Sequence, residues 1–313
     1  MHIVVTGGTG FIGRALCESL FQEGHRVTIL TRQAREASQL LGAIVTAVEW
    51  NGREAGVWEQ SLEGTDAVIN LAGAPIADAR WTHGRKQLLT DSRLLTTRLL
   101  VAAMSRCSSS PRTLISASGI GYYGASDDRV LDEGAARGQG FLADLCLAWE
   151  AEALRAAEVG ARVVLLRTGM VLEQDGGALP KMLMPFRLFV GGSIMPGSQW
   201  VSWIHRRDHV GLIQWALATP RVSGPLNAVA PRAVTMNQFC DVLGRVLRRP
   251  SWLPVPGVAL HLALGELGTL MTTGQRINPA KALSGGYAFH YPTLEPALRA
   301  ILTKEERREK SLT

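Results

Sequence analysis

The sequence predicts an α/β fold in which a doubly wound parallel sheet is joined to a smaller C-terminal lobe. Three observations lead to this prediction. Apolar runs of strand length alternate with helical patterns up to about residue 217, a glycine-rich turn follows the first run, and the alternation breaks after Gly169 into a stretch rich in Gly, Pro and Met. The chain has 313 residues, of which 46% are hydrophobic, which is enough for one large domain with a smaller lobe.

The first strand and the turn after it are the most informative part of the chain. The strand leads into Gly7-Gly-Thr-Gly-Phe-Ile-Gly13, and a helical pattern follows. Gly7 permits a tight turn, Gly10 lets the backbone approach a pyrophosphate, and Gly13 lets the helix pack close to the strand. This arrangement is typical of a Rossmann-like dinucleotide site, with the phosphates at the helix N-terminus. We therefore expect the cofactor to contact the following residues: Gly7, Thr9, Gly10, Phe11, Ile12 and Gly13. The alternative is an ordinary glycine-rich turn.

The end of the second strand, Arg26 to Leu30, indicates which dinucleotide is bound. An NAD-binding protein usually has Asp or Glu there, to bind the ribose 2′-hydroxyl. This chain has Thr31 and Arg32 instead, with Arg35 close behind. A guanidinium group pairs with a 2′-phosphate, so we predict NADP(H) rather than NAD(H). The alternative is that Arg32 is a solvated loop charge.

Further elements follow along the chain. We predict strands at 43–50, 66–72, 113–116 and 161–166, with a Trp-rich strand near 200–205. Helices are predicted at 87–104, where leucines at 88, 95, 99 and 100 recur on one face, and at 141–158, 208–217 and 236–247. A proline-rich turn at 249–256 begins the C-terminal lobe.

Composition excludes several classes of protein. The formal net charge of +6 comes without a Lys/Arg stripe interleaved with aromatics, so nucleic-acid binding is not expected. Four cysteines, Cys17, Cys107, Cys146 and Cys240, lack disulfide or metal spacing, so we expect reduced thiols and no metal. The most apolar stretch, 258–271, is too short to span a bilayer and contains a His and a Glu. With a strand at the N-terminus and no signal peptide expected, the prediction is a cytoplasmic protein without membrane association.

The chain resembles the extended short-chain dehydrogenases/reductases, and within them an atypical epimerase-like subfamily, family 39U, with its bacterial homologues. The resemblance runs nearly end to end and rests on the following segments: 6–13, 31–32, 70–73, 81 with 91–93, 122–124, 166–172, 202–205, 224–231, 274–283 and 291–294. It implies that the segment from about 249 to 302 is the small domain at the end of this subfamily.

The resemblance also implies roles for matching positions. Leu71, Ala72 and Gly73 would lie under the adenine ribose and phosphates, and Arg93 would face the cofactor from the other side. The loop ending at Val171 would meet the nicotinamide. The alternatives are a plain strand end, a surface helix charge and a packing turn.

The catalytic group of the broad family is missing. A Tyr-x-x-x-Lys pair normally lets an ammonium lower the phenol pKa for proton transfer. If Glu150 marks the acid that follows this pair, the Lys position falls on Cys146 and the Tyr position on Leu142. This departure puts ordinary dehydrogenase or epimerase chemistry in doubt.

Other groups near the end of the fifth strand are candidates for catalysis. Ser116 and Ser118 would lie over the nicotinamide, and Ser116 is predicted to contact the cofactor. Ser118 with Tyr122 or Tyr123 could bond and protonate a carbonyl oxygen, with charge supplied by the lysines at 86 and 181. For the tyrosines, pocket lining is an equal alternative, and for the lone His205 a structural role is favoured.

Two functions remain open. One is an NADP(H)-dependent oxidoreductase or epimerase-like enzyme with an unidentified small-molecule substrate. The other is a non-catalytic NADPH sensor or interaction protein, since some relatives carry a cell-division label. The predicted units are a Rossmann domain at 1–230 with an insertion near 170–205 that contributes to the cleft, a small domain at 231–303 and a polar tail at 304–313. The resemblance also implies a homodimer formed through the helices at 88–104 and 141–158.

Overall fold

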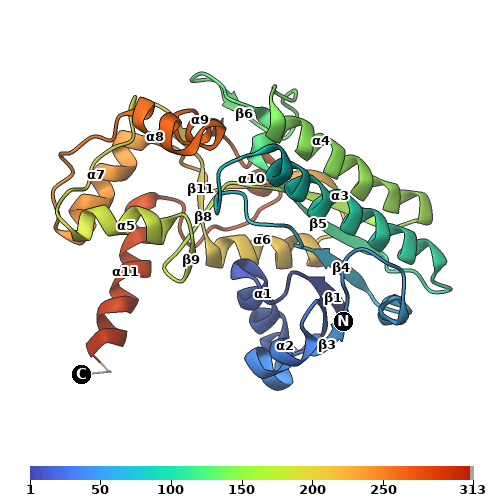
Figure 1. Cartoon of the computed structure of the whole chain (residues 1–313). Helices are drawn as coiled ribbons and strands as arrows, with labels where there is room; N and C mark the ends of the chain where they lie inside the picture. Colours follow the sequence, from blue (N-terminus) through green and yellow to red (C-terminus); the bar gives the residue numbers. More distant parts are fainter. Residues whose placement is uncertain (311–313) are drawn as a thin grey trace.

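A seven-stranded parallel sheet forms the centre of the molecule (Figure 1). The structure is a computed structural model that describes residues 1–310. The strand order is β12-β7-β5-β4-β1-β2-β3 and every neighbouring pair is parallel. The strands are β1 (His2–Thr6), β2 (Arg26–Thr31), β3 (Thr46–Glu49), β4 (Ala67–Asn70), β5 (Thr113–Gly119), β7 (Arg162–Thr168) and β12 (Gly224–Ala228). The order reverses between β1 and β4, the place where ligands bind in open α/β sheets.

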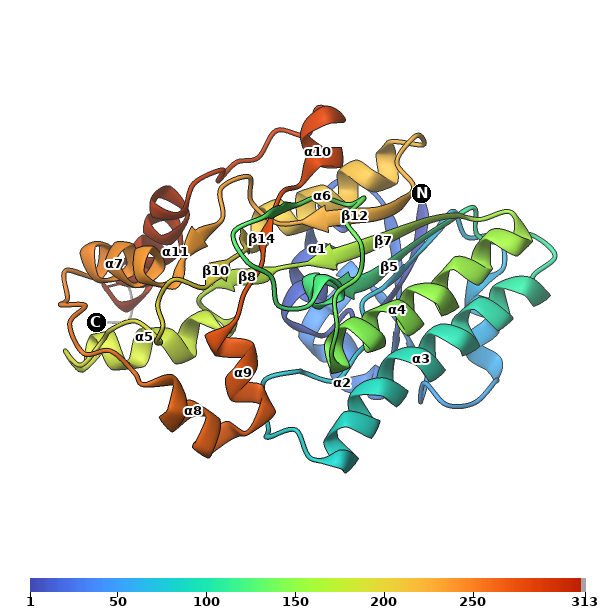
Figure 2. The same ribbon diagram turned by 90° about the horizontal axis from the view of Figure 1, so that it is seen from above.

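Helices cover both faces of this sheet (Figure 2). One face packs against α1 (Phe11–Gln22), α2 (Ala34–Leu41) and α6 (Arg206–Ala218). The other packs against α3 (His83–Arg106) and α4 (Phe141–Leu154). Because both faces are covered, the middle of each central strand is mainly apolar, with Ile3, Val4 and Val5 fully buried. The predicted doubly wound α/β fold is confirmed.

A second core holds the C-terminal lobe together. It is formed by α5 (Leu179–Arg187), α7 (Met236–Leu247), α11 (Leu294–Lys310) and β11 (Trp203–His205), around the fully buried Trp203 and Phe239. Small sheets connect the lobe to the Rossmann part: β11 with β8 (Met170–Glu173) and β9 (Gly176–Gly177), β10 (Trp200–Val201) with β13 (Val234–Thr235), and β14 (Arg276–Ile277) with β6 (Val130–Leu131). Two short helices complete it, α8 (Gly257–Leu264) and α9 (Glu266–Thr272), whereas α10 (Ala280–Ser284) packs against the Rossmann part through Ala282.

Some predicted elements differ from the structure. The Trp-rich stretch 200–205 is not one strand, because Ser202 interrupts it and its two halves pair with different partners, β13 and β8. Of the four leucines predicted on one face of α3, only Leu100 is fully buried, and Leu88 and Leu95 are exposed. The core face is formed with Leu89, Arg93 and Thr97 instead. The strand β12 and the helix α2 were not predicted. The predicted tail at 304–313 begins inside α11, and its residues 311–313 lie outside the described part of the chain.

Candidate functional site

The glycine turn and the start of α1 lie at the carboxyl end of β1. Gly7 has a φ of +70°, and a Cβ there would lie 2.9 Å from the Leu71 carbonyl. A Cβ on Gly13 would lie 2.1 Å from the Gly7 oxygen, so helix and turn touch through backbone alone. Gly10 caps α1 without a side-chain hydrogen bond, which leaves the first N–H groups of the helix for a ligand. Thr9, Phe11 and Ile12 flank this turn and are partly buried.

The residues predicted to bind the 2′-phosphate of the cofactor lie at the end of β2. Thr31 is the last residue of the strand and its hydroxyl accepts a hydrogen bond from the Gln33 N–H at 3.4 Å. Arg32 follows it and is exposed, and among residues 1–310 no side chain pairs with its guanidinium group. Since β1 and β2 are parallel neighbours, Arg32 lies at the same sheet edge as the glycine turn.

The loop after β4 packs on Arg93 from α3. The Thr6 hydroxyl bonds both Asn70 and the Ala72 N–H, which fixes the Leu71–Ala72 backbone beside the turn. Arg93 is buried and donates to the carbonyl oxygens of Leu89 and Ala74. A Cβ on Gly73 would lie 3.2 Å from the guanidinium carbon. The alternative interpretation, in which Arg93 is a solvated charge on the helix surface, is therefore wrong.

The charge of Arg93 is not balanced inside the protein. No carboxylate within the described chain pairs with it, and burial lowers its pKa to about 10. The guanidinium group lies 5.2 Å from the centroid of the Trp149 ring. A buried cation with only neutral partners, next to the loop at the sheet edge, favours an anionic ligand there.

A hairpin from the C-terminal half lies against the glycine turn. It consists of β8, which contains the buried Val171, and β9, whose Gly176 approaches the Phe11 ring so closely that a Cβ would lie 2.5 Å from it. Arg206 links the hairpin to the start of α1. It donates to the Phe11 carbonyl at 3.4 Å, lies 5.0 Å from the Phe11 ring centroid and pairs with Glu173 at 3.3 Å. The same guanidinium group pairs with Asp175 at 2.5 Å.

Two of the three predicted catalytic hydroxyl groups belong to a buried network. Ser118 donates to Glu150 at 2.6 Å, and Arg167 makes a two-pronged ion pair with the same carboxylate at 2.8 Å. Arg167 also donates to the Tyr123 hydroxyl at 3.0 Å, which in turn donates to Asn227 at 2.7 Å. All five side chains are nearly inaccessible to solvent, and burial raises the pKa of Tyr123.

The remaining predicted groups have different surroundings. Tyr122 is partly exposed, its ring lies 3.4 Å from the Arg167 guanidinium carbon, and within residues 1–310 its hydroxyl has no hydrogen-bond partner. Ser116 is fully buried and accepts a hydrogen bond from Asn70. Neither predicted lysine contacts the tyrosines, since Lys86 pairs with Glu266 and Lys181 with Asp78.

His205 has a structural setting. Its ring stacks on Tyr291 at a centroid distance of 4.2 Å and accepts the Arg207 N–H at the start of α6.

Leu142 and Cys146, which occupy the positions of the missing Tyr and Lys, lie against the turn that carries Tyr122. A Cβ on Gly121 would lie 2.9 Å from the Leu142 Cβ, and one on Gly119 would lie 3.7 Å from the Cys146 sulfur. Burial raises the pKa of the Cys146 thiol, so it stays neutral. The helix α4 contains neither Tyr nor Lys.

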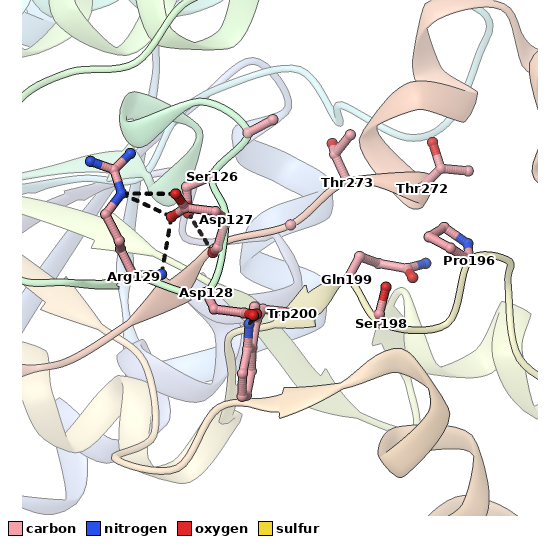
Figure 3. A pocket seen from close by; sticks show the side chains of 12 residues that line it. Ser126, Asp127, Asp128, Arg129, Pro196, Ser198, Gln199, Trp200, Thr272 and Thr273 are labelled. Carbon is pink, nitrogen blue, oxygen red and sulfur yellow. Dashed lines mark hydrogen bonds and ion pairs between the residues drawn. The ribbon is translucent and has the colours of Figure 1, made fainter.

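A cavity of about 460 Å³ opens beside this region (Figure 3). It lies between the loop at 125–129, the segment 196–200 and the end of α9 at 272–274, and none of the predicted site residues lines it. Most of its side chains are polar. In the cavity wall the Trp200 indole donates to Asp128 at 2.7 Å and Asp127 pairs with Arg129 at 2.8 Å. A hydrogen bond from Gln275 to the Gly124 carbonyl connects this wall to the residue after Tyr123. The described residues contain no cluster of His, Cys, Asp or Glu that could hold a metal ion.

Sequence reasoning missed the centre of the buried network. Arg167 and Asn227 lie inside segments that carried the family resemblance, but no role was assigned to them. The available signal was a charged residue inside the apolar strand 162–168, because a buried charge requires a partner. Arg206 was also missed.

The strand order, the uncapped helix and the glycine turn together define a dinucleotide-binding α/β protein. Comparison with protein families agrees. The model of the NAD dependent epimerase/dehydratase family matches residues 3–229, and a domain of unknown function, DUF1731, matches residues 255–301. The chain belongs to the NAD-dependent epimerase/dehydratase family.

Relatives narrow the position within this family. The chain is 42% identical to the chloroplastic SDR39U1 homolog of Arabidopsis thaliana, over 96% of this chain and 87% of the relative. It is 41% identical to the epimerase family protein YfhF of Bacillus subtilis, over 96% and 98%. A crystal structure of human SDR39U1 with NADPH covers 96% of this chain and 99% of its own, with 34% identity and a TM-score of 0.86. The predicted resemblance to the epimerase-like subfamily is confirmed.

Proposed function

We propose that this chain binds NADP(H) and is an oxidoreductase or epimerase-like enzyme acting on a small molecule that carries a carbonyl or alcohol group. The observation that carries the proposal is the sheet edge at which four features meet: an α1 N-terminus without a side-chain cap, a glycine-rich turn, Arg32 and the unpaired charge of Arg93. The two cations and the helix end match the phosphates of the cofactor. The NADPH in the human relative supports the same assignment.

In this proposal each group at the edge has one part to play. The turn at 7–13 and the loop at 71–73 hold the pyrophosphate and ribose, and Arg32 pairs with the 2′-phosphate. When bound, the nicotinamide supplies or accepts a hydride. Tyr122 is the group that exchanges a proton with the substrate oxygen, because its hydroxyl is the predicted one without an internal partner. Ser118 and Tyr123 are positioning residues, since both hydroxyls are held in the Glu150–Arg167 network.

A specific observation favours a second function. The Tyr and Lys positions hold Leu142 and Cys146, which can neither lower a phenol pKa nor transfer a proton at neutral pH. A protein with an intact cofactor site and no proton donor would bind NADPH and report its presence to a partner. This sensor is the alternative to the enzyme.

A fluorescence titration with NADPH and NADH tests the cofactor assignment. For Arg32→Asp we expect about a 10- to 100-fold weaker NADPH affinity and little change for NADH, since one charged hydrogen-bonding group is lost. Arg112→Asp is the matched control. Arg112 is also exposed, but it precedes β5 and so lies at the amino ends of the strands, away from the glycine turn. Its substitution should change neither affinity. Equal NADPH and NADH affinities in the unmodified protein would contradict the assignment.

A second measurement separates the two functions. The NADPH-loaded protein is mixed with a panel of aldehydes and ketones and the nicotinamide absorbance is followed. The enzyme should oxidise the cofactor with at least one compound, and Tyr122→Phe should slow that oxidation about 100-fold or more. Tight binding with no oxidation by any compound would favour the sensor.

A further inference from the structure

The short helix α8 is apolar on all sides and lies at the surface. Its sequence, GVALHLAL, contains one polar side chain and no acid. Val258 and Leu262 are 73% and 74% exposed, and their spacing of four residues places them on one helix face. No helix in the described chain is both long and apolar enough to cross a membrane, and α8 has only eight residues. An exposed apolar surface of this kind marks a site of contact with a membrane or another molecule.

An exposed aromatic pair precedes α8 in the same lobe. Trp252 is 63% exposed and Phe189 is 53% exposed. The Trp252 indole donates to the Phe189 carbonyl at 3.0 Å, and its backbone N–H bonds Gly191, so the two segments are tied together. Phe189 has a φ of +63°, a strained conformation for a residue with a large side chain. Further exposed apolar residues of these two segments are Met184, Leu188, Val190 and Leu253.

Two exposed arginines adjoin this patch, Arg248 and Arg249, and no ion pair is formed by either within the described residues. Neither 176–207 nor 242–265 contains an Asp or Glu, whereas both contain arginines. Arg248 and Arg249 are exposed and precede Trp252 by four and three residues, and the Arg249 guanidinium group lies 4.3 Å from the centroid of the Phe189 ring. Both views place α5, α7 and α8 at the same end of the molecule, away from β1 to β3 (Figures 1 and 2).

We infer that this end of the C-terminal lobe docks on an anionic lipid surface. The aliphatic face of α8 and the Phe189–Trp252 pair enter the boundary between headgroups and acyl chains, and Arg248 and Arg249 bind lipid phosphates. Exposed Trp and Phe beside arginines is the composition found at membrane–water boundaries. The complementary charge favours this occupant over an apolar protein surface, which would leave the arginines without partners.

Sedimentation with lipid vesicles tests the inference on the full chain. Vesicles of phosphatidylcholine are compared with vesicles of equal parts phosphatidylcholine and phosphatidylglycerol. We expect binding to the anionic vesicles only, decreasing as salt is raised. Val258→Gln with Leu262→Gln should weaken it at least about tenfold, since two apolar side chains no longer enter the lipid. Arg248→Asn with Arg249→Gln should weaken it by a similar factor.

Val57→Gln is the matched control, because Val57 is an equally exposed aliphatic residue in the Rossmann part and its substitution should leave binding unchanged. Circular dichroism confirms that each variant is folded. The inference is overturned by a lack of binding to anionic vesicles, by equal binding of the α8 variant, or by light scattering in which that variant turns a dimer into a monomer.

Discussion

His209 is a fully buried imidazole at the start of α6. Its Nε2 lies 3.0 Å from the Thr168 hydroxyl, and its Nδ1 has no partner among the described residues. Burial lowers the pKa of His209 to about 4. The imidazole is therefore neutral in the folded protein and becomes protonated readily only when the chain unfolds.

This residue makes stability depend on pH in the mildly acidic range. Between the unfolded pKa near 6.5 and the folded pKa near 4, the unfolded chain binds the extra proton, so the free energy of unfolding falls as the pH is lowered through that window. The shift from 6.5 to about 4 corresponds to roughly 3 kcal/mol. Urea unfolding of His209→Gln between pH 7 and pH 4 should show about that much less pH dependence than the parent protein. Replacing the exposed His83 by Gln is the control and should leave the dependence intact.

At the scale of the element, β7 and α4 are joined by an ion pair inside the core. Arg167 and Glu150 are 97% and 94% buried as side chains, and the pair also orients Ser118 and Tyr123. Forming a buried pair costs desolvation on both sides, so removing one partner measures the penalty of the charge left unpaired and not the net contribution of the pair. The network thus fixes the geometry of the turn that carries Tyr122.

Removing one partner should therefore be costly. We expect Arg167→Met to lower the free energy of unfolding by about 3–5 kcal/mol, because the Glu150 carboxylate is left buried without a cation. Combining it with Glu150→Gln should recover part of this loss. Arg98→Met breaks the ion pair of Arg98 with Glu152 on the surface and should cost about 1 kcal/mol or less. Equal losses in Arg167→Met and Arg98→Met would show that burial of the pair is unimportant.

Helices and strands with a strong local sequence pattern could be predicted. Within the site, the glycine turn could be predicted because its shape depends on local backbone sterics. The turn at Gly7–Gly13 could be predicted because a Cβ at Gly7 or Gly13 would clash with nearby backbone. The helix α7 was predicted with the bounds that the structure has. Of the side-chain network only the charge of Arg167 gave a signal, and its partners could not be predicted, since Ser118 and Asn227 are joined only through the tertiary contacts of β5, α4, β7 and β12. The same holds for Arg206, whose partners are a hairpin and a turn remote in sequence.

At the scale of the whole molecule, one apolar surface fits the predicted homodimer. Leu88 and Leu95 on α3, and Leu147 and Leu154 on α4, are exposed, and in each helix the two are seven residues apart. These are the helices through which the family resemblance implies that two chains pair. The homodimer stays a prediction, and so do the cytoplasmic location and the domain boundaries at 230 and 303.

Charged residues on that surface should separate the two chains. If the dimer forms there, Leu95→Glu with Leu147→Glu should convert it to a monomer, as measured by light scattering after size-exclusion chromatography, because two carboxylates per chain would be buried without cations. Leu40→Glu, on the exposed side of α2, should leave the dimer unchanged. A parent protein that is monomeric at all concentrations would contradict the prediction.

The hairpin of β8 and β9 has a consequence for timing. It rests on Phe11, and Arg206 links it to the glycine turn by pairing with Glu173 and Asp175 of the hairpin and donating to the Phe11 carbonyl. We expect a nucleotide bound at that turn to be released when the hairpin moves away from Phe11. The dissociation rate of the nucleotide then depends on the ion pairs of Arg206. Its preference for NADPH over NADH depends on Arg32. The dissociation rate and the nucleotide preference can therefore change independently, through residues on opposite sides of the same turn.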